Sequence, residues 1–164
     1  MPHPSSYGEA ENFKFRVVGI TFDKGRVLIH RSERDDFWAL PGGHIEINEP
    51  SDETLKREMI EELDEKVEIG RLVFVAENFF EFEGRSYHEL ALYYLMELPD
   101  DSELREKEEF YGKEDEYWGK ETELKLIFRW YPVDDLDDLD LYPTFLKEKL
   151  KSLPDRTEHI VHRD

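Results

Sequence analysis

Residues 42–65 (GGHIEINEPSDETLKREMIEELDE) concentrate side chains that could bind a cation, with nine acidic residues against two basic ones. On a helix drawn at ~100° per residue, Glu58, Glu61 and Glu62 share one arc, and the wheel places Arg57 off it. Carboxylates crowded in this way repel one another unless something neutralises them. Carboxylate oxygens without Cys or His ligands favour hard ions such as Mg²⁺ or Mn²⁺. The stretch therefore predicts a divalent-cation site; the alternative is a solvated acidic helix face.

A helix from residue 51 to about 64 is expected to carry these acids. Ser51 is a good N-cap residue, and acids follow it in the first turn, as the helix dipole favours. Leu55, Met59 and Leu63 recur every four residues and predict an apolar stripe that packs on a sheet. The stripe and the acidic arc adjoin, so packing of the helix would also fix the carboxylates in place.

The spacing of the acids and glycines is more informative than their number. It reads G-x5-E-x7-R-E-x-x-E-E, which resembles the signature of the Nudix hydrolases (MutT-like). The matching positions are Gly43, Glu49, Arg57, Glu58, Glu61 and Glu62. Two positions depart from the family pattern, since Asp64 stands where the family usually has Gly, and Glu65 where it has an aliphatic residue. Asp tolerates the left-handed conformation better than most residues, so we expect the helix exit to survive.

The resemblance implies roles for these residues. Glu58 and Glu62, with Glu61 and the carbonyl of Gly43, would hold Mg²⁺ (with Mn²⁺ as a substitute), and Arg57 would pair with Glu49 to bind the loop to the helix. The implied reaction is hydrolysis of a phosphoanhydride in a small nucleoside-diphosphate derivative. The proton acceptor stays open between Glu61, Glu62 and four acids of a later loop. Those four are Glu114, Glu116, Glu121 and Glu123.

Other residues are candidates for contacts with substrate. Those that could contact phosphate are His44, His88, Arg16, His30, Arg31 and Arg85. Those that could stack on a base are Tyr111, Tyr117 and Trp118. For each of them an ordinary polar or packing role is the alternative.

The remaining chain predicts the elements that position this site. Apolar, β-branched and aromatic runs predict strands, a run with Pro143 in its first turn predicts a helix, and Lys24-Gly25 and Glu83-Gly84 mark turns. The expected strands are 13–22, 26–31, 37–44, 71–84, 85–98 and 124–133, with a helix at 142–153 and a charged loop or insertion at 99–123. This order implies an α/β (α+β) fold in which a mixed sheet is sandwiched between helices.

Length and composition fit one domain. We expect a polar arm at residues 1–12, a single domain at 13–153 and a tail at 154–164. The formal net charge of −19 disfavours nucleic-acid polymers and anionic membranes as partners. No apolar run is long enough to span a membrane, and the absence of cysteine fits a reducing cytoplasm. The family resemblance allows a homodimer but does not require one.

Two functions other than hydrolysis fit the same resemblance. A catalytically silent Nudix-fold module that binds a nucleotide would commonly lack some of the six positions, and all six are present here. An isomerase of isoprenoid diphosphates would use cysteine in its usual acid pair, and this chain has none. Hydrolysis of a small nucleotide is therefore the favoured hypothesis, with the particular nucleotide left open.

Overall fold

The structure is a computed structural model that describes residues 12–113, 116–117, 120–121 and 124–164, so most of the expected N-terminal arm lies outside it. The main helix is α1 (Ser51–Leu63), and α2 (Leu146–Lys149) is a short one. Two 3₁₀ turns, η3 (Glu103–Glu106) and η4 (Val133–Asp138), join strands. The strands are β1 (Phe13–Ile20), β2 (Phe22–Asp23), β3 (Arg26–Ser32), β4 (Gly42–His44), β5 (Glu68–Phe82), β6 (Arg85–Glu97), β7 (Glu109–Lys113), β8 (Glu116–Tyr117), β9 (Lys120–Glu121), β10 (Lys125–Pro132) and β11 (Glu158–Arg163).

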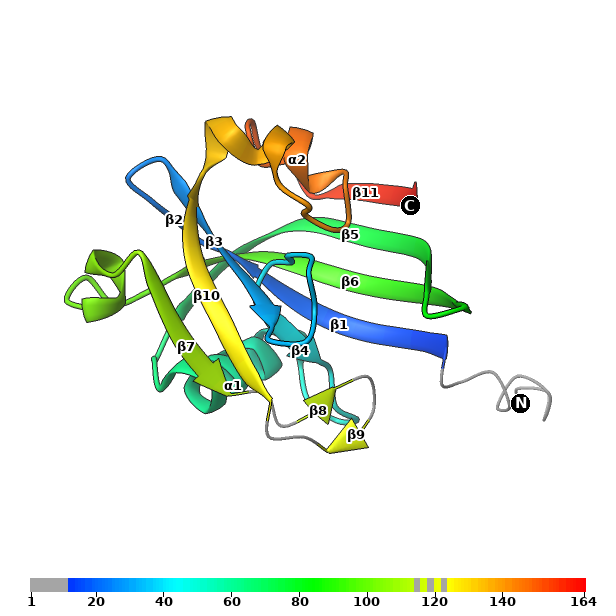
Figure 1. Ribbon diagram of the computed structural model, residues 1–164, viewed down its shortest axis with the longest axis horizontal. Coiled ribbons are helices and arrows are strands. Elements are labelled where there is room, and N and C mark those ends of the chain that lie inside the picture. The colour runs from blue at the N-terminus through cyan, green and yellow to red at the C-terminus, as the bar shows by residue number, and fades with distance from the viewer. Residues whose placement is uncertain (1–11, 114–115, 118–119, 122–123) are drawn as a thin grey trace.

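Two sheets form the body of the molecule (Figure 1). The larger is mixed and has the strand order β11-β5-β6-β1-β4, in which β1 and β6 run parallel while β5 and β6 form a long antiparallel hairpin. The second sheet is antiparallel, with the order β2-β3-β10-β7. The sequence predicted one mixed sheet between helices. The α/β class is confirmed, but the main strands divide into two sheets, and β8 and β9 form a separate two-stranded sheet.

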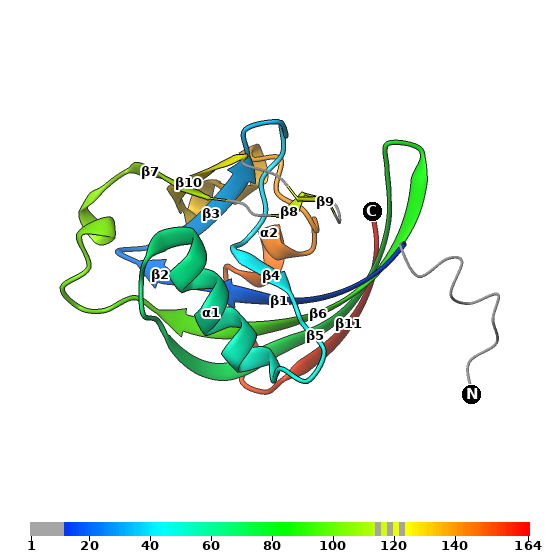
Figure 2. The same cartoon turned by 90° about the horizontal axis from the view of Figure 1, so that it is seen from below.

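The helices cover opposite faces of the mixed sheet (Figure 2). Leu55 and Met59 of α1 are fully buried with Val17 of β1, in a cluster that the second sheet also joins through Leu28 and Phe128. The predicted apolar stripe of α1 is therefore confirmed. On the other face, α2 and the segments beside it close a separate cluster around the mixed sheet, with members such as Phe74, Tyr93, Leu136 and Leu146.

Turn chemistry sets the two hairpins that the sequence predicted. Lys24 and Gly25 both have positive φ (52° and 76°) and join β2 to β3, while Glu83 and Gly84 do the same (50° and 78°) between β5 and β6. The first hairpin differs from the prediction in one respect. β1 does not pair with β3, because the chain leaves the mixed sheet near Thr21 and enters the second sheet.

Two predicted segments differ from the structure. The stretch 99–123, expected as a loop, contains η3 and strand β7, whose Phe110 and Gly112 are buried and alternate with the exposed Glu109, Tyr111 and Lys113. The stretch 142–153, expected as one helix, is helical only at Leu146–Lys149. Leu146 and Leu150 are both buried, and their four-residue spacing is the pattern that predicted a longer helix.

The expected tail is also wrong for its larger part. Residues 158–163 form β11, which pairs in parallel with β5 and places Ile160 in the core. The strand is short and polar, and its partner lies about eighty residues earlier in the chain, so no local pattern marked it. In the described residues, none of the helices is long and apolar enough to span a membrane.

The ends of α1 follow the predicted chemistry in part. Ser51 is the first helical residue rather than the N-cap, and its hydroxyl hydrogen-bonds with Tyr94 at 2.7 Å. At the other end Asp64 adopts the left-handed conformation (φ 55°, ψ 38°), and its N–H donates to the carbonyl of Ile60 at 2.9 Å. The expectation that Asp could replace Gly at this exit is confirmed.

Candidate active site

Strand β4 brings Gly43 against the acidic face of α1. β4 is held by β1, with Val17 opposite Gly43. A Cβ built on Gly43 would lie 2.6 Å from Cγ and from Oε1 of Glu58, a separation that real Cβ atoms do not show. A side chain at this position would displace the carboxylate of Glu58, so glycine allows the present close approach, and the predicted proximity of Gly43 to the acids is present.

Arg57 contacts three carboxylates of the site. Its Nε and Nη2 donate to the two oxygens of Glu49, each at 3.0 Å, in a two-pronged pair. Its Nη1 donates to both oxygens of Glu61 at 3.1 Å and to Oε1 of Glu58 at 3.3 Å. The helical wheel placed Arg57 off the acidic arc, and this was wrong. The wheel marks only the Cα position, whereas the long side chain reaches Glu61 one turn later.

Glu49 is fixed by a second donor that the sequence analysis did not single out. Thr54, fully buried in the first turn of α1, donates its hydroxyl to Oε1 of Glu49 at 2.7 Å. Hydrogen bonds from Arg57, and next from Thr54, hold the pKa of Glu49 below its usual value, and the bond to Glu49 raises the pKa of Arg57. The sequence could have indicated this hydrogen bond, because Thr54 lies in the first turn of the helix only five residues after Glu49.

The three helical carboxylates differ in exposure. The side chain of Glu61 is 42% exposed and that of Glu58 is 15% exposed, whereas Glu62 is buried. β7 covers the last turn of α1, because Gly112 lies so near the carbonyl of Glu62 that an added Cβ would be 2.5 Å from it. The unpredicted strand β7 thus shields the most buried acid of the site.

The residues fit a divalent cation only as an open site. Among the described residues, no group of three or more His, Cys, Asp or Glu side chains is arranged to hold a metal ion. The expected ligand set of Gly43, Glu58, Glu61 and Glu62 is therefore not gathered into a closed cage, since Arg57 binds Glu61 and Glu58. The donors are nevertheless all oxygens, and the backbone of Gly43 lies directly against the carboxylate of Glu58. Mg²⁺ commonly takes one or two carboxylates and completes its shell with water and substrate phosphates.

The candidate histidines have different surroundings. His44 follows Gly43 in β4, and burial, then Arg16 and Lys14, lower its pKa to about 4. His30 is buried, and burial followed by Arg16 lowers its pKa to about 3. Both are therefore neutral near pH 7, so neither would attract phosphate as a cation.

Several other candidates are engaged elsewhere in the structure. His88 stacks on Phe79, with ring centroids 4.3 Å apart. Arg31 lies over the ring of Trp38, 5.3 Å from its centroid, and Tyr111 is 61% exposed on β7. The remaining loop candidates lie outside the residues whose side chains are described: Glu114, Glu116, Tyr117, Trp118, Glu121 and Glu123.

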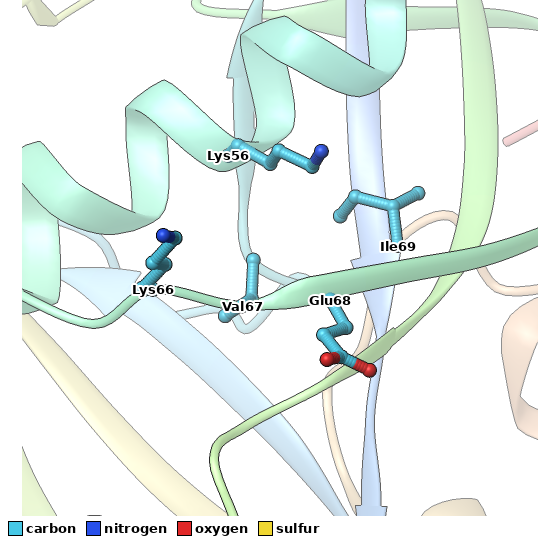
Figure 3. Close-up of a pocket in the computed structure, with 5 residues that line it drawn as sticks. All are labelled: Lys56, Lys66, Val67, Glu68 and Ile69. Carbon is cyan, nitrogen blue, oxygen red and sulfur yellow. The ribbon is translucent and has the colours of Figure 1, made fainter.

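A surface hollow beside α1 does not coincide with this site. Its volume is about 560 Å³. It is lined by Lys56, Lys66, Val67, Glu68 and Ile69. In Figure 3 the amines of Lys56 and Lys66 point in different directions and do not converge on one point. None of the six positions of the acidic motif lines this hollow.

Comparison with known proteins agrees with this geometry. The sequence model of the NUDIX domain matches residues 13–154. The mouse diphosphoinositol polyphosphate phosphohydrolase 3-alpha is 32% identical over 120 residues, which cover 70% of this chain and 73% of the relative. The 8-oxo-dGTP diphosphatase of Buchnera aphidicola is 26% identical over 150 residues, or 89% and 88% of the two chains. A NUDIX hydrolase of Nitrosomonas europaea has the same fold, with a TM-score of 0.59 and 18% identity over 92% of this chain and 79% of the other.

The chain belongs to the Nudix hydrolase family, since the family match covers most of its length and includes the whole acidic motif. It is a Nudix pyrophosphohydrolase, in agreement with its MutT-like relatives. Members of the family generally use divalent metal ions and hydrolyse pyrophosphate bonds. The open carboxylate site on α1 is consistent with both properties.

Proposed function

We propose that the protein is a Mg²⁺-dependent hydrolase that cleaves a phosphoanhydride bond in a small nucleoside diphosphate linked to another moiety. The observation that carries the proposal is the contact of Gly43 with Glu58 beside the fork from Arg57 to Glu49. This arrangement joins the loop and the helix of the motif into one rigid unit. Such rigidity keeps charged groups oriented for a reaction in which phosphate charge changes.

The nucleotide part of the proposal rests on a relative and on charge. The Buchnera relative, which aligns over 89% of this chain, is named for a nucleotide, 8-oxo-dGTP, whereas the mouse relative, which aligns over 70%, is named for an inositol phosphate. A polyphosphorylated inositol needs many cationic partners, and this chain carries a net charge of −19. A nucleotide with two phosphates needs fewer. We place the activity in the cytoplasm, because a chain without cysteine forms no disulfide bond and so fits a reducing compartment.

Each residue of the site has a proposed task. Glu58, Glu62 and the carbonyl of Gly43 would hold Mg²⁺, with Glu61 able to join them once it leaves Arg57. A bound Mg²⁺ would neutralise charge on the phosphates and lower the pKa of a water molecule. Arg57 and Glu49 keep β4 and α1 in register. Glu61 or Glu62, or an acid of the loop at 114–123, would accept the proton of the attacking water.

The test replaces the proposed ligands one at a time. Glu58→Gln and Glu62→Gln retain size but remove charge, and each should lower turnover at least ~100-fold with Mg²⁺, the scale of a lost transition-state electrostatic contact. Glu53→Gln, an exposed acid in the first turn of the same helix, should leave turnover unchanged and serves as the control. Release of phosphate or pyrophosphate is measured over a panel of nucleoside triphosphates, nucleotide sugars and dinucleotides.

Two outcomes would overturn the proposal. If both Gln variants keep near-parental activity on a substrate that the parent cleaves, Glu58 and Glu62 do not hold the metal. If no member of the panel is cleaved although nucleotides bind, the protein is a silent nucleotide-binding module. A melting temperature that rises with millimolar Mg²⁺ in the parent but not in Glu58→Gln would independently support the metal site.

A further inference from the structure

The face of the mixed sheet on the α2 side, here called the inner face, changes from apolar to polar at one end. Along β5 and β6 the facing pairs Phe74 with Tyr93 and Ala76 with Ala91 belong to the core. The next facing pair on this side is Asn78 with Glu89. Both are buried, being 4% and 6% exposed. A polar pair at this depth, directly opposite across two strands, is a departure from the pattern of the core.

The hydrogen-bonding capacity of this pair is not used within the described part of the chain. The buried Oδ1 of Asn78 has no hydrogen-bond partner there. The cation paired with Glu89 is Arg16 of β1, whose Nη1 lies 3.9 Å from Oε2, beyond hydrogen-bond distance. Burial raises the pKa of Glu89, against the opposing effect of Arg16 and Lys14. Buried polar atoms almost always have partners in folded proteins, so the Oδ1 of Asn78 is available to accept a hydrogen bond from a ligand or a water molecule.

The surroundings favour a flat ligand. The next pair toward the hairpin turn is Phe80 with Tyr87, whose rings lie within 16° of parallel, with centroids 5.3 Å apart. Lys14 lies over Tyr87 on the same side. On the neighbouring strand, His162 faces Asn78 but already hydrogen-bonds Thr144. Aromatic surface beside an amide and a carboxyl is suited to a ring with polar edges.

The polar pair is continuous with the proposed catalytic site through β4. Gly43 faces Glu58 on the α1 side of the sheet, and the next residue, His44, is paired with Arg16 of β1. Arg16 in turn approaches Glu89. A substrate whose phosphates lie at Gly43 could therefore reach the inner face around β4, which is the edge strand of the mixed sheet.

We propose that Asn78 and Glu89 recognise the nucleobase of the substrate by hydrogen bonds to its edge. This inference rests on the proposed function and specifies where the nucleotide is read. An amide offers a donor and an acceptor side by side, and the carboxyl group of Glu89 offers acceptors beside it, which together match the donors and acceptors on the edge of a base. A phosphate group at this pair would instead lie against the acidic side chain of Glu89, which would repel it.

The first experiment tests base recognition without catalysis or metal. Adenosine, guanosine, cytidine and uridine are titrated separately into the ¹⁵N-labelled full chain, and the side-chain amide signal of Asn78 is followed by NMR. One nucleoside should shift this signal, and its dissociation constant should rise at least about tenfold in Asn78→Leu and in Glu89→Gln. Glu81→Gln, an exposed acid on β5 with the opposite alternation, is the control and should bind as the parent does.

The second experiment separates this inference from the proposed function. With the cleaved nucleotide, Asn78→Leu and Glu89→Gln should raise KM at least about tenfold, change kcat less than threefold, and reduce discrimination between bases. If all four nucleosides fail to shift the Asn78 amide, or if discrimination stays within twofold of the parent while nucleotides are cleaved, the inference is wrong and the proposed function stands. If a nucleoside binds but no nucleotide is cleaved, base recognition stands and the proposed function fails. Glu89→Gln keeps the size of the side chain, so it remains informative if Asn78→Leu does not fold.

Discussion

At the scale of single residues, Arg57 makes more contacts than one cationic side chain usually supports. Its guanidinium donates to Glu49 with two nitrogens and to Glu61 with the third, and it also reaches Glu58. The planar fork permits this because its donors point in fixed, separate directions. A lysine ammonium is a single point and could serve only one of these carboxylates well.

Arg57→Lys should therefore lose activity and stability together. The loop at Glu49 would no longer be bound to the helix, and a small displacement of Gly43 from Glu58 should lower kcat about 10- to 100-fold. Steady-state hydrolysis and thermal melting of the metal-free protein measure the two effects. Lys56→Arg changes the neighbouring residue in the opposite sense and should leave both unchanged. Parental turnover and melting temperature in the Arg57→Lys variant would show that the fork to Glu49 is dispensable.

The buried His30 should make the stability of the protein depend on pH. Burial lowers its pKa to about 3 from the 6.5 of an unfolded chain, so between these values the unfolded chain holds a proton that the folded one lacks. Stability should therefore be fully present above pH 6.5 and fall as the pH decreases toward 3. The slope from this residue alone is about 1.4 kcal/mol per pH unit.

The variant His30→Phe should remove that part of the slope. Urea unfolding at about pH 7 and about pH 5, on either side of the ordinary histidine pKa, gives the free energies to compare between parent and variant. Phe128→Leu perturbs the ring that packs against His30, so it should lower stability at both pH values without changing the slope. An unchanged slope in His30→Phe would mean that His30 is already protonated in the folded protein at the lower pH.

At the scale of elements, the exit of α1 combines two unfavourable features. Asp64 occupies the left-handed conformation with a Cβ, and no basic residue lies in the last turn to complement the helix dipole. Asp64→Gly should raise the free energy of unfolding by about 1 kcal/mol, because it removes both the strain and the charge. Asp64→Ala removes the charge but keeps the Cβ, so it should be less stable than Asp64→Gly. Denaturant unfolding of the three proteins decides, and equal stability of the Gly and Ala variants would contradict the strain argument.

Elements were predictable from the sequence where their signal is local. The β5-β6 hairpin follows from alternation around Glu83-Gly84, and α1 from a four-residue apolar stripe. β7 was missed because its three exposed positions made the segment look like a solvated loop, although Phe110 and Gly112 alternate inward. The six motif positions identified the loop and the helix of the site. Thr54, Asn78 and Glu89 did not stand out, because their importance comes from strands and turns that meet only in the folded chain.

At the scale of the whole molecule, the C-terminal strand closes the core. β11 lies beyond the last residue of the family match, yet it pairs with β5 along its whole length. Ile160 points inward and is 9% exposed, whereas the adjacent Val161 is 59% exposed. Ile160→Ala should lower the free energy of unfolding by about 2–3 kcal/mol.

Val161→Ala is the matched control for this prediction. It removes a similar amount of apolar side chain from the other face of the same strand and should change stability by no more than about 0.5 kcal/mol. Denaturant unfolding measures both variants. Equal effects would mean that β11 does not pack against the core in solution.

Because Gly43 and His44 face opposite sides of β4, insertions and deletions in this strand should be poorly tolerated during evolution. Neighbouring residues of a strand face opposite sides, so inserting or deleting one residue in β4 would exchange the two sides. A side chain would then meet Glu58, and the position paired with Arg16 would change. Insertions should accumulate instead in the turns at 33–36 and 100–108, whereas homologous chains should keep a constant length between Pro41 and Glu49.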